Sequence, residues 1–567
     1  MKLRSTELLG GEGSGLYRSL FKAMGYTDYE LNGKPLIGIV NSWNTLVPGH
    51  FNLKLLAEFV KKGIYSNGGT AVEFGVPGAC DGIAQGHDGM KYILPSREII
   101  CNSVEIMAEA HKLDGLVMLA SCDKIVPAML MAAVRLDLPA IIVHGGPMLG
   151  GIEFDGRKSD FTSIDEARGM LASGAITETD MLSLENLASP CCGSCCFLGT
   201  ANTMCCITEA LGLSLPGSAL IPAVHAERQR SSFESGRVIC DLVRNETSAR
   251  KIITKEAIRN GIKTAMAICG STNAVLHLSA LAFEAELDMN VVEEFKTLNK
   301  TTPQIARVNP AAKWDMEAFY RAGGIPRVMC NLGDLLDTDV LTCTGKTIKE
   351  NLAGYVFQYP SNDEVIKTRE TAYSQTGGIA VLHGNLAPDS AISKPGSIDP
   401  SLHSFTGRAK VFDSEEAAEK AILESKIQKG DVVVIRYEGP KGGPGMREMF
   451  RAMKFIYGMG LSTSTALITD GRFSGTNNGC FVGHISPEAA EGGPLAIVED
   501  GDEIHIDVIQ GILMLKVPEG EIERRLKNWV KPEKAIPRGY LQIYAKIASS
   551  ADKGAVIDYR ELVTGNS

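Results

Sequence analysis

The sequence predicts two domains: an N-terminal α/β domain built on a parallel sheet, and a smaller, β-rich, barrel-like C-terminal domain. Three observations carry this prediction. The chain has 567 residues, which is too long for a single hydrophobic core. Strand-like and helix-like segments alternate along the first two thirds, whereas the last third is mostly strand-like with Gly-rich turns. Because the character changes near this point, we expect domains at residues 1–375 and 376–567.

The N-terminal elements alternate regularly. Short apolar runs bounded by polar residues indicate buried strands, and stretches with helical periodicity, one of them stopped by Gly68 and Gly69, indicate the helices between them. The expected order is strand, helix, strand, helix, strand, helix and strand, at residues 35–43, 50–69, 70–76, 98–112, 115–124, 127–139 and 140–147. This rhythm implies a parallel sheet with helices on both faces, and ligands in such sheets collect at the carboxyl ends of the strands.

The C-terminal third is expected to consist mostly of strands rather than of alternating strands and helices. Strands are expected at residues 377–385, 429–440, 464–471, 494–508 and 512–518. The apolar–polar alternation on either side of Gln510 and Gly511 predicts a hairpin. A helix at 519–530 is expected to be the last one, before the C-terminal tail.

Composition excludes several function classes. The net charge is −10, and no basic run offsets it, so we expect no nucleic-acid partner. No apolar stretch reaches the length of a membrane span, and the first 20 residues lack the apolar core of a signal peptide. We therefore expect a cytoplasmic protein with no membrane partner.

The 14 cysteines do not form the pattern of a small disulfide scaffold. Six of them crowd between residues 191 and 206, which in a reducing compartment indicates metal or cluster chemistry. A second group is expected to consist of small buried hydrophobic side chains, namely Cys101, Cys240, Cys269, Cys330 and Cys343. Cys205 and Cys206 lie in a helix-like segment and are expected to serve packing.

Three separate segments offer metal ligands. Cys80 precedes Asp81, Cys122 precedes Asp123, and residues 190–196 read PCCGSCC. Thiolates suit iron–sulfur clusters or zinc, and carboxylates suit magnesium or manganese, so the two Cys-Asp pairs favour a soft cluster beside a hard cation. A zinc ribbon needs paired CxxC motifs, and the spacing occurs only once in this region, which makes zinc the weaker alternative.

The C-terminal domain adds two Gly-rich segments, at residues 437–449 and 469–479. Such density of glycine lets backbone amides close on an anionic ligand. Glu448 is a candidate cation ligand. Ser474 is a candidate proton carrier, although a serine hydroxyl needs a metal or another charge to lower its pKa.

Long segments of the chain resemble the dihydroxy-acid dehydratase family, which also contains 6-phosphogluconate and sugar-acid dehydratases. The resemblance runs from about residue 30 to residue 556, in the order of the family. It rests on the segments CDGIAQGHDGMKYILPSREII, CDKIVPAMLMAA, CGSCCFLGTANTMCCITEALGLSLPGSA, AICGSTNAVLHL, VVVIRYEGPKGGPGMREM, ALITDGRFSG and GHISPEAAEGGP.

The resemblance implies a role for each matching residue. Cys122 and Cys195 would ligate an iron–sulfur cluster, and Ser474, as an alkoxide, would be the catalytic base. The magnesium ligands would be Asp81, Asp123, Glu448 and Lys124, the last as a carboxylated side chain, which converts an amine into an oxygen donor.

One position departs from the family pattern. Some family members carry a third cluster cysteine where this chain has Gly49. Cys80 is the natural substitute and Cys192 a weaker one. The departure leaves open whether the cluster is [2Fe-2S] or [4Fe-4S].

The activity implied is a hydro-lyase reaction that converts 2,3-dihydroxy-3-methylbutanoate, or its 3-methylpentanoate homologue, to the 2-oxo acid in valine and isoleucine biosynthesis. The alternative is a sugar-acid dehydratase that forms a 2-keto-3-deoxy acid from an aldonate. A branched-chain substrate requires an apolar wall, whereas an aldonate requires hydroxyl partners. A non-enzymatic iron–sulfur protein is a third, weaker alternative. The family also implies a homodimer or a tetramer.

Overall fold

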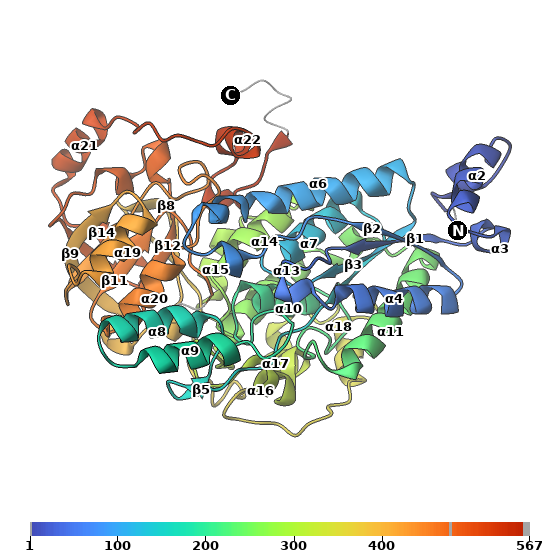
Figure 1. The fold of residues 1–567 in the computed structure, drawn as a ribbon, viewed down its shortest axis with the longest axis horizontal. Helices are drawn as coiled ribbons and strands as arrows, with labels where there is room; N and C mark the ends of the chain where they lie inside the picture. Colours follow the sequence, from blue (N-terminus) through green and yellow to red (C-terminus); the bar gives the residue numbers. More distant parts are fainter. Residues whose placement is uncertain (1–2, 476–478, 560–567) are drawn as a thin grey trace.

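A four-stranded parallel sheet forms the centre of the N-terminal half (Figure 1). The computed structural model describes residues 3–475 and 479–559. The strands lie in the order β2-β1-β3-β4 and span β1 Leu36–Asn41, β2 Thr70–Gly75, β3 Gly115–Ala120 and β4 Ala140–His144. All neighbouring pairs are parallel. The parallel sheet expected from the alternating pattern is therefore confirmed.

Helices cover both faces of this sheet (Figure 1). Helices α4 (Leu53–Ser66) and α11 (Ala226–Arg244) lie on one face, and α6 (Pro95–Ala110) and α7 (Ile125–Leu136) lie on the other. Helices α4 and α11 pack very closely: a Cβ on Gly63 would lie 2.0 Å from the Phe233 carbonyl oxygen, and one on Gly236 would lie 2.2 Å from that of Val60. Glycine is required at both positions because the two backbones meet there.

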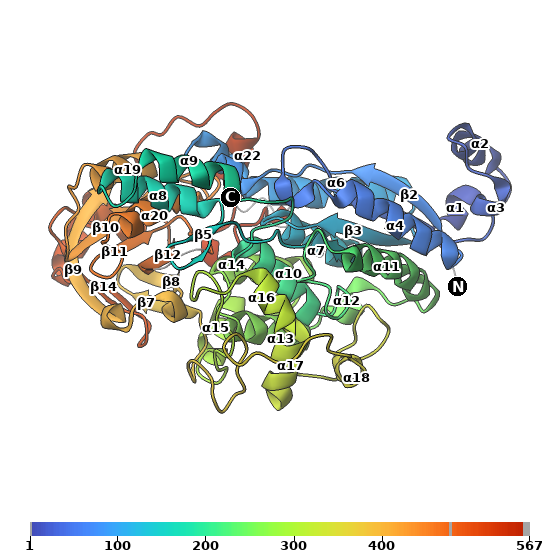
Figure 2. The ribbon, with the colours of Figure 1, turned by 60° about the horizontal axis from the view of Figure 1, so that its bottom comes forward.

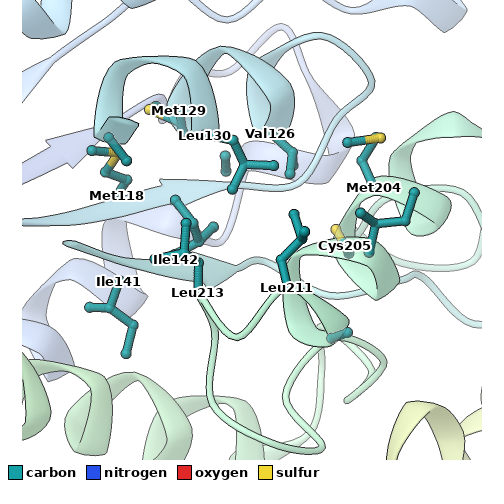
Figure 3. Packing of buried hydrophobic residues seen from close by; sticks show 14 of the residues in the cluster. Met118, Val126, Met129, Leu130, Ile141, Ile142, Met204, Cys205, Leu211 and Leu213 are labelled. Atoms are coloured by element: carbon teal, nitrogen blue, oxygen red, sulfur yellow. The ribbon is translucent and has the colours of Figure 1, made fainter. Parts of the chain in front are cut away.

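The remaining elements before the barrel are mostly helical. They are α1 Thr6–Leu9, α2 Gly15–Ala23, α3 Asp28–Leu31, α5 Asp81–Ala84, β5 Glu153–Phe154, β6 Arg157–Lys158, α8 Thr162–Ala172, α9 Glu178–Leu187, α10 Thr200–Ala210, α12 Ala249–Ile252, α13 Lys255–Ala267, α14 Asn273–Glu284, α15 Val291–Leu298, α16 Met316–Arg321, α17 Gly324–Leu332 and α18 Ile348–Ala353. Figure 3 shows Met204 and Cys205 of α10 in the core with Val126 of α7. Cys205 and Cys206 are buried, which confirms their expected packing role.

Eight strands of the C-terminal part close into a barrel, which confirms the barrel-like prediction. Their order around the barrel is β10-β11-β12-β8-β7-β14-β13-β9. They span β7 Ala380–Gly384, β8 Ala387–Ser393, β9 Ser404–Phe412, β10 Asp431–Ile435, β11 Ala466–Thr469, β12 Cys480–Ser486, β13 Glu503–Asp507 and β14 Ile512–Leu515. Strands β13 and β14 pair in antiparallel fashion across Gln510 and Gly511, as the hairpin prediction requires.

Among the described residues, four α-helices accompany the barrel, and only the one that begins at Glu519 was expected. They are α19 Glu415–Leu423, α20 Phe450–Gly458, α21 Glu519–Asn528 and α22 Tyr540–Ile547. The prediction that residues 519–530 form the last helix is wrong, because α22 follows.

The expectation that Cys330 is a buried hydrophobic side chain is also wrong. Its side chain, near the end of α17, is exposed, whereas Cys101, Cys240, Cys269 and Cys343 are buried as expected.

Helix α8 comes from the N-terminal half of the sequence but packs against α20 of the barrel region, and α9 packs against α8 (Figure 2). A buried ion pair joins the two parts, with Lys454 Nζ 2.8 Å from Glu166 Oε1. Gly169 of α8 meets Gly458 of α20 so closely that a Cβ on either would collide with the other's backbone. This packing fixes the barrel loops next to the sheet. The boundary at residues 375 and 376 stays a prediction.

None of the helices within residues 3–475 and 479–559 has the length and apolarity that a membrane span requires.

Candidate metal centre

Two of the Cys-Asp pairs follow strands of the same sheet, β2 and β3, which lie on either side of β1. Cys122 and Asp123 come directly after β3 and just before α7, while Cys80 and Asp81 follow β2 at the start of α5. The carboxyl ends of parallel strands meet at one edge of a sheet, which brings the two loops together. The structure thus places Cys122 and Asp123 at the end of a strand, as the sequence predicted.

Three carboxylates converge at this edge. One oxygen each of Asp81, Asp123 and Glu448 lies within 4.8 Å of the other two. Glu448 comes from the segment just before α20 of the barrel region and is fully buried. Carboxylate oxygens are the ligands that Mg²⁺ prefers, so this donor set fits a magnesium ion.

Basic and amide groups surround Glu448. Lys124 Nζ lies 3.2 Å from both Asp123 Oδ2 and Glu448 Oε1. The Arg472 guanidinium is ion-paired with Glu448, and Gln85 Nε2 donates to Glu448 Oε2 at 2.9 Å. Burial raises the pKa of Glu448, but Arg472 and Lys124 outweigh burial and lower this pKa to about 2. Glu448 is therefore held as a carboxylate.

The pKa of Asp81 is shifted in the opposite direction from that of Glu448. Burial raises the pKa of Asp81 well above its usual range, and the nearby charges of Asp123 and Glu448 raise it further. The negative charges of Asp123 and Glu448 thus oppose ionisation of the half-buried Asp81. A divalent cation would relieve this repulsion, which is a second reason that the donor set fits magnesium.

Replacing Asp81 by asparagine is expected to stabilise the metal-free protein. Because folded Asp81 binds its proton more tightly than the unfolded chain does, the wild-type protein in EDTA loses stability as the pH rises above the ordinary aspartate range. Asp81→Asn is expected to remove this loss and to raise the melting temperature in EDTA. It is also expected to abolish the further rise that Mg²⁺ should produce in the wild type if the three carboxylates bind it.

Asp88→Asn is a matched control, because Asp88 is exposed and its pKa is lowered by Lys91. It is expected to give no gain in EDTA. An Asp81→Asn protein that melts like the wild type both with and without Mg²⁺ would contradict this account.

Three thiols lie beside the carboxylates. Burial raises the pKa of Cys122 well above its usual range, and the charges of Cys80 and Asp81 raise it further. Burial also raises the pKa of Cys195, followed by the charges of Asp81 and Asp123 and then of Cys122. The pKa of Cys80 is raised to about 12, by burial and then by Asp81. Such thiols stay protonated until a positively charged metal group holds them as thiolates, so this set fits an iron–sulfur cluster.

Gly49 lies against the sulfur of Cys122. A Cβ on Gly49 would lie 2.5 Å from Cys122 Sγ and 3.3 Å from the Ser194 nitrogen. A cysteine at this position would therefore point at the thiol group, and this chain lacks that ligand. Cys192 has different neighbours from the other thiols. Burial raises the pKa of Cys192, and the charge that raises it further is that of Cys191 rather than of Asp81 or Asp123. Of the two substitutes, these surroundings favour Cys80.

Ser474 lies next to the carboxylates along the chain. Its side chain is buried, and it follows Arg472, the partner of Glu448, by two residues. The carbonyl of the preceding Phe473 accepts a hydrogen bond of 3.1 Å from Asn273 Nδ2. Residues 476–478 of the same Gly-rich segment lie outside the described residues.

The other Gly-rich segment does not present its amides to a ligand as expected. The amides of Tyr437 and Glu438 donate to Asp470. Those of Lys441 and Gly442 donate to Glu488. Internal carboxylates thus take up these four amides, and the hypothesis of an anion site at this segment is wrong for them.

Sequence reasoning missed three residues that contact Glu448, namely Gln85, Asn273 and Arg472. All three lie inside segments that carry the family resemblance. Their contacts join residues far apart in the chain, so spacing alone gives no signal for them.

Comparisons with known proteins cover almost the whole chain. Residues 34–351 match the model described as dihydroxy-acid/6-phosphogluconate dehydratase N-terminal, and residues 364–555 match the corresponding C-terminal model. The chain is 50% identical over 556 residues to a dihydroxy-acid dehydratase of Caldanaerobacter subterraneus, covering 98% of this chain and 99% of the relative. It is 49% identical over 558 residues to that of Acetivibrio thermocellus, covering 98% and 100%, and 50% identical over 542 residues to that of Methanosarcina barkeri, covering 95% and 97%.

Proposed function

This chain belongs to the dihydroxy-acid/6-phosphogluconate dehydratase family and is a hydro-lyase, and from this premise we propose that its substrate is a branched-chain 2,3-dihydroxy acid. The preferred substrates are 2,3-dihydroxy-3-methylbutanoate and its 3-methylpentanoate homologue, which would give the 2-oxo acids of valine and isoleucine biosynthesis. The observation that carries the proposal is the full-length identity of about 50% to relatives named dihydroxy-acid dehydratase.

The proposed cofactors are Mg²⁺ and an iron–sulfur cluster of the [2Fe-2S] or [4Fe-4S] type. Asp81, Asp123 and Glu448 would hold the cation, and Cys122 and Cys195 would hold the cluster with Cys80 as the third thiolate. When bound, the two groups supply Lewis-acid sites for the carboxylate and the hydroxyl groups of the substrate.

Lys124 is the fourth proposed magnesium ligand. Its Nζ lies 3.2 Å from each of two proposed ligand carboxylates, so an oxygen placed there by carboxylation would enter the same site. An unmodified ammonium group in that position repels a cation. Carboxylation of Lys124 therefore fits the site better than the free amine does.

The proposed base is Ser474. Its alkoxide would remove the proton from C2, and the electron pair of that bond would form the C2–C3 double bond while the C3 hydroxyl departs. The proton that Ser474 has taken up would pass to this departing hydroxyl, so that water is released and the alkoxide is restored. The resulting enol tautomerises to the 2-oxo acid, so the reaction needs no net electron transfer. Arg472, two residues before Ser474, is ion-paired with Glu448 and so joins the segment of the proposed base to a proposed magnesium ligand.

A substrate panel tests the proposal. Anaerobically purified protein is offered the two branched-chain dihydroxy acids and the aldonates arabinonate, xylonate and gluconate, and formation of the 2-oxo acid is measured. We expect the branched-chain acids to have the highest kcat/KM. Turnover of an aldonate alone would establish the alternative sugar-acid dehydratase, and absence of any turnover in cluster-loaded protein would favour the non-enzymatic alternative.

Cys80→Ser is expected to lower the iron and sulfide content of the reconstituted protein and to weaken its visible absorbance, because serine is a poor ligand for iron in a cluster. Cys192→Ser serves as the matched control, since Cys192 is half-buried and lies beside Cys191. The reverse outcome, with loss of the cluster in Cys192→Ser and retention in Cys80→Ser, would reassign the third thiolate.

Three further proposals follow from family membership and composition. The chain would divide into domains at residues 1–375 and 376–567, it would assemble as a homodimer or tetramer, and it would be cytoplasmic.

A further inference from the structure

Asn273 joins the two halves of the proposed active site. It is the first residue of α14, and its side chain is fully buried. Its Nδ2 lies 3.1 Å from the Phe473 carbonyl oxygen and 3.5 Å from Glu448 Oε1. One amide group thus faces a proposed magnesium ligand and the backbone that leads directly into the proposed base.

The three neighbours of Asn273 Nδ2 fix the orientation of this amide. Nδ2 also lies 2.8 Å from Thr200 Oγ1, at the start of α10. Two of its three neighbours are a carboxylate and a carbonyl, which can only accept hydrogen bonds, so the nitrogen of the amide must point toward them. Asn273 Oδ1 points elsewhere and has no hydrogen-bond partner within residues 3–475 and 479–559.

The Asn273 backbone is itself held by a polar network on the N-terminal side. The Asn273 amide donates to Ser271 Oγ at 3.2 Å, and Ser271 Oγ lies 3.0 Å from Thr200 Oγ1. The Ser271 amide donates to Thr203 Oγ1 at 3.0 Å. These bonds tie the beginnings of α10 and α14 together, so Asn273 offers a rigid donor to two segments that the barrel region contributes.

We infer that Asn273 is a positioning residue that fixes Glu448 and the Ser474 segment relative to each other. This inference depends on the roles proposed above for Glu448 and Ser474. A ligand carboxylate is oriented by the hydrogen bonds that it accepts, and loss of such a partner typically lowers metal affinity or activity by about 10–100-fold. The neutral amide can donate to the carboxylate and the carbonyl, whereas an aspartate would repel both.

The test is metal binding and turnover of Asn273→Ala in the full-length, cluster-loaded protein. Binding of Mn²⁺, as a probe for Mg²⁺, is measured by electron paramagnetic resonance without substrate. We expect the Kd for Mn²⁺ to rise and kcat to fall, each by about 10-fold or more. The cluster absorbance is expected to persist, because none of its proposed ligands contacts Asn273.

Two further variants separate positioning from a general loss of structure. Thr200→Val keeps the shape of the side chain but removes the hydroxyl that accepts from Asn273, and we expect smaller changes in the same direction. Asn260→Ala is the matched control: Asn260 is also fully buried, but it hydrogen-bonds the backbone of Asp337 in another part of the domain. It is expected to lower the melting temperature without a change in Mn²⁺ affinity.

Wild-type affinity and kcat in folded Asn273→Ala, or in Thr200→Val should Asn273→Ala fail to fold, would overturn the inference. Equal losses of Mn²⁺ affinity in Asn273→Ala and Asn260→Ala would overturn it as well, since they would show a general loss of structure. A wild-type protein that binds no Mn²⁺ would instead contradict the proposed function.

Discussion

Replacing Ser474 by alanine is expected to lower kcat by about 10²- to 10⁴-fold, the usual contribution of a general base. The change removes the hydroxyl that would take the C2 proton. It leaves the proposed metal ligands in place, because Ser474 is two residues beyond Arg472 and on a different segment from Glu448. The visible absorbance of the cluster and the Mg²⁺-dependent rise in melting temperature should therefore remain as in the wild type.

Ser464→Ala is a suitable control for this experiment. Ser464 lies in the turn before β11 and donates to the Leu461 carbonyl oxygen, away from the three carboxylates. It should keep wild-type kcat. If Ser474→Ala also retained wild-type kcat, Ser474 would not be the base.

The second large effect is expected for Cys122→Ser. Cys122 adjoins both thiols proposed to share the cluster, and Gly49 offers no replacement beside it. A serine hydroxyl is a hard ligand and is rarely deprotonated near neutral pH, so the cluster should not assemble. We expect loss of the visible iron–sulfur absorbance together with loss of turnover, both measured on anaerobically reconstituted protein.

Cys206→Ser makes the same thiol-to-hydroxyl change in the core of α10. It should cost stability, because it buries a hydroxyl in an apolar environment, but it should retain the cluster. An unchanged spectrum in Cys122→Ser would remove Cys122 from the ligand set.

The sequence predicted the sheet and the position of Cys122 and Asp123 at the end of a strand because both depend on local patterns. The run at residues 115–120 is continuously apolar and ends two residues before the Cys-Asp pair, as expected of a strand buried on both faces. Strand β3 ends at Ala120, so Cys122 and Asp123 follow its carboxyl end. In the structure Asp81 likewise follows the carboxyl end of β2.

What the sequence did not predict depends on long-range packing. Helix α20 begins two residues after Glu448, inside a region that otherwise reads as strands, and its apolar side chains pack against α8 and the barrel. The contact between Asn273 and Glu448 joins residues 175 positions apart. Cys330 looked like a core residue because burial of a single cysteine cannot be read from its neighbours, and it lies on the exposed side of its helix.

The central claim is that this chain dehydrates its substrate at a combined cluster and magnesium site. The most direct measurement is the rate of 2-oxo acid formation from 2,3-dihydroxy-3-methylbutanoate as anaerobic apoprotein is loaded stepwise with iron and sulfide, with and without Mg²⁺. We expect the rate to rise in proportion to cluster content, to vanish in EDTA and to return when Mg²⁺ is added. Full turnover by protein without iron, or in EDTA, would contradict the account.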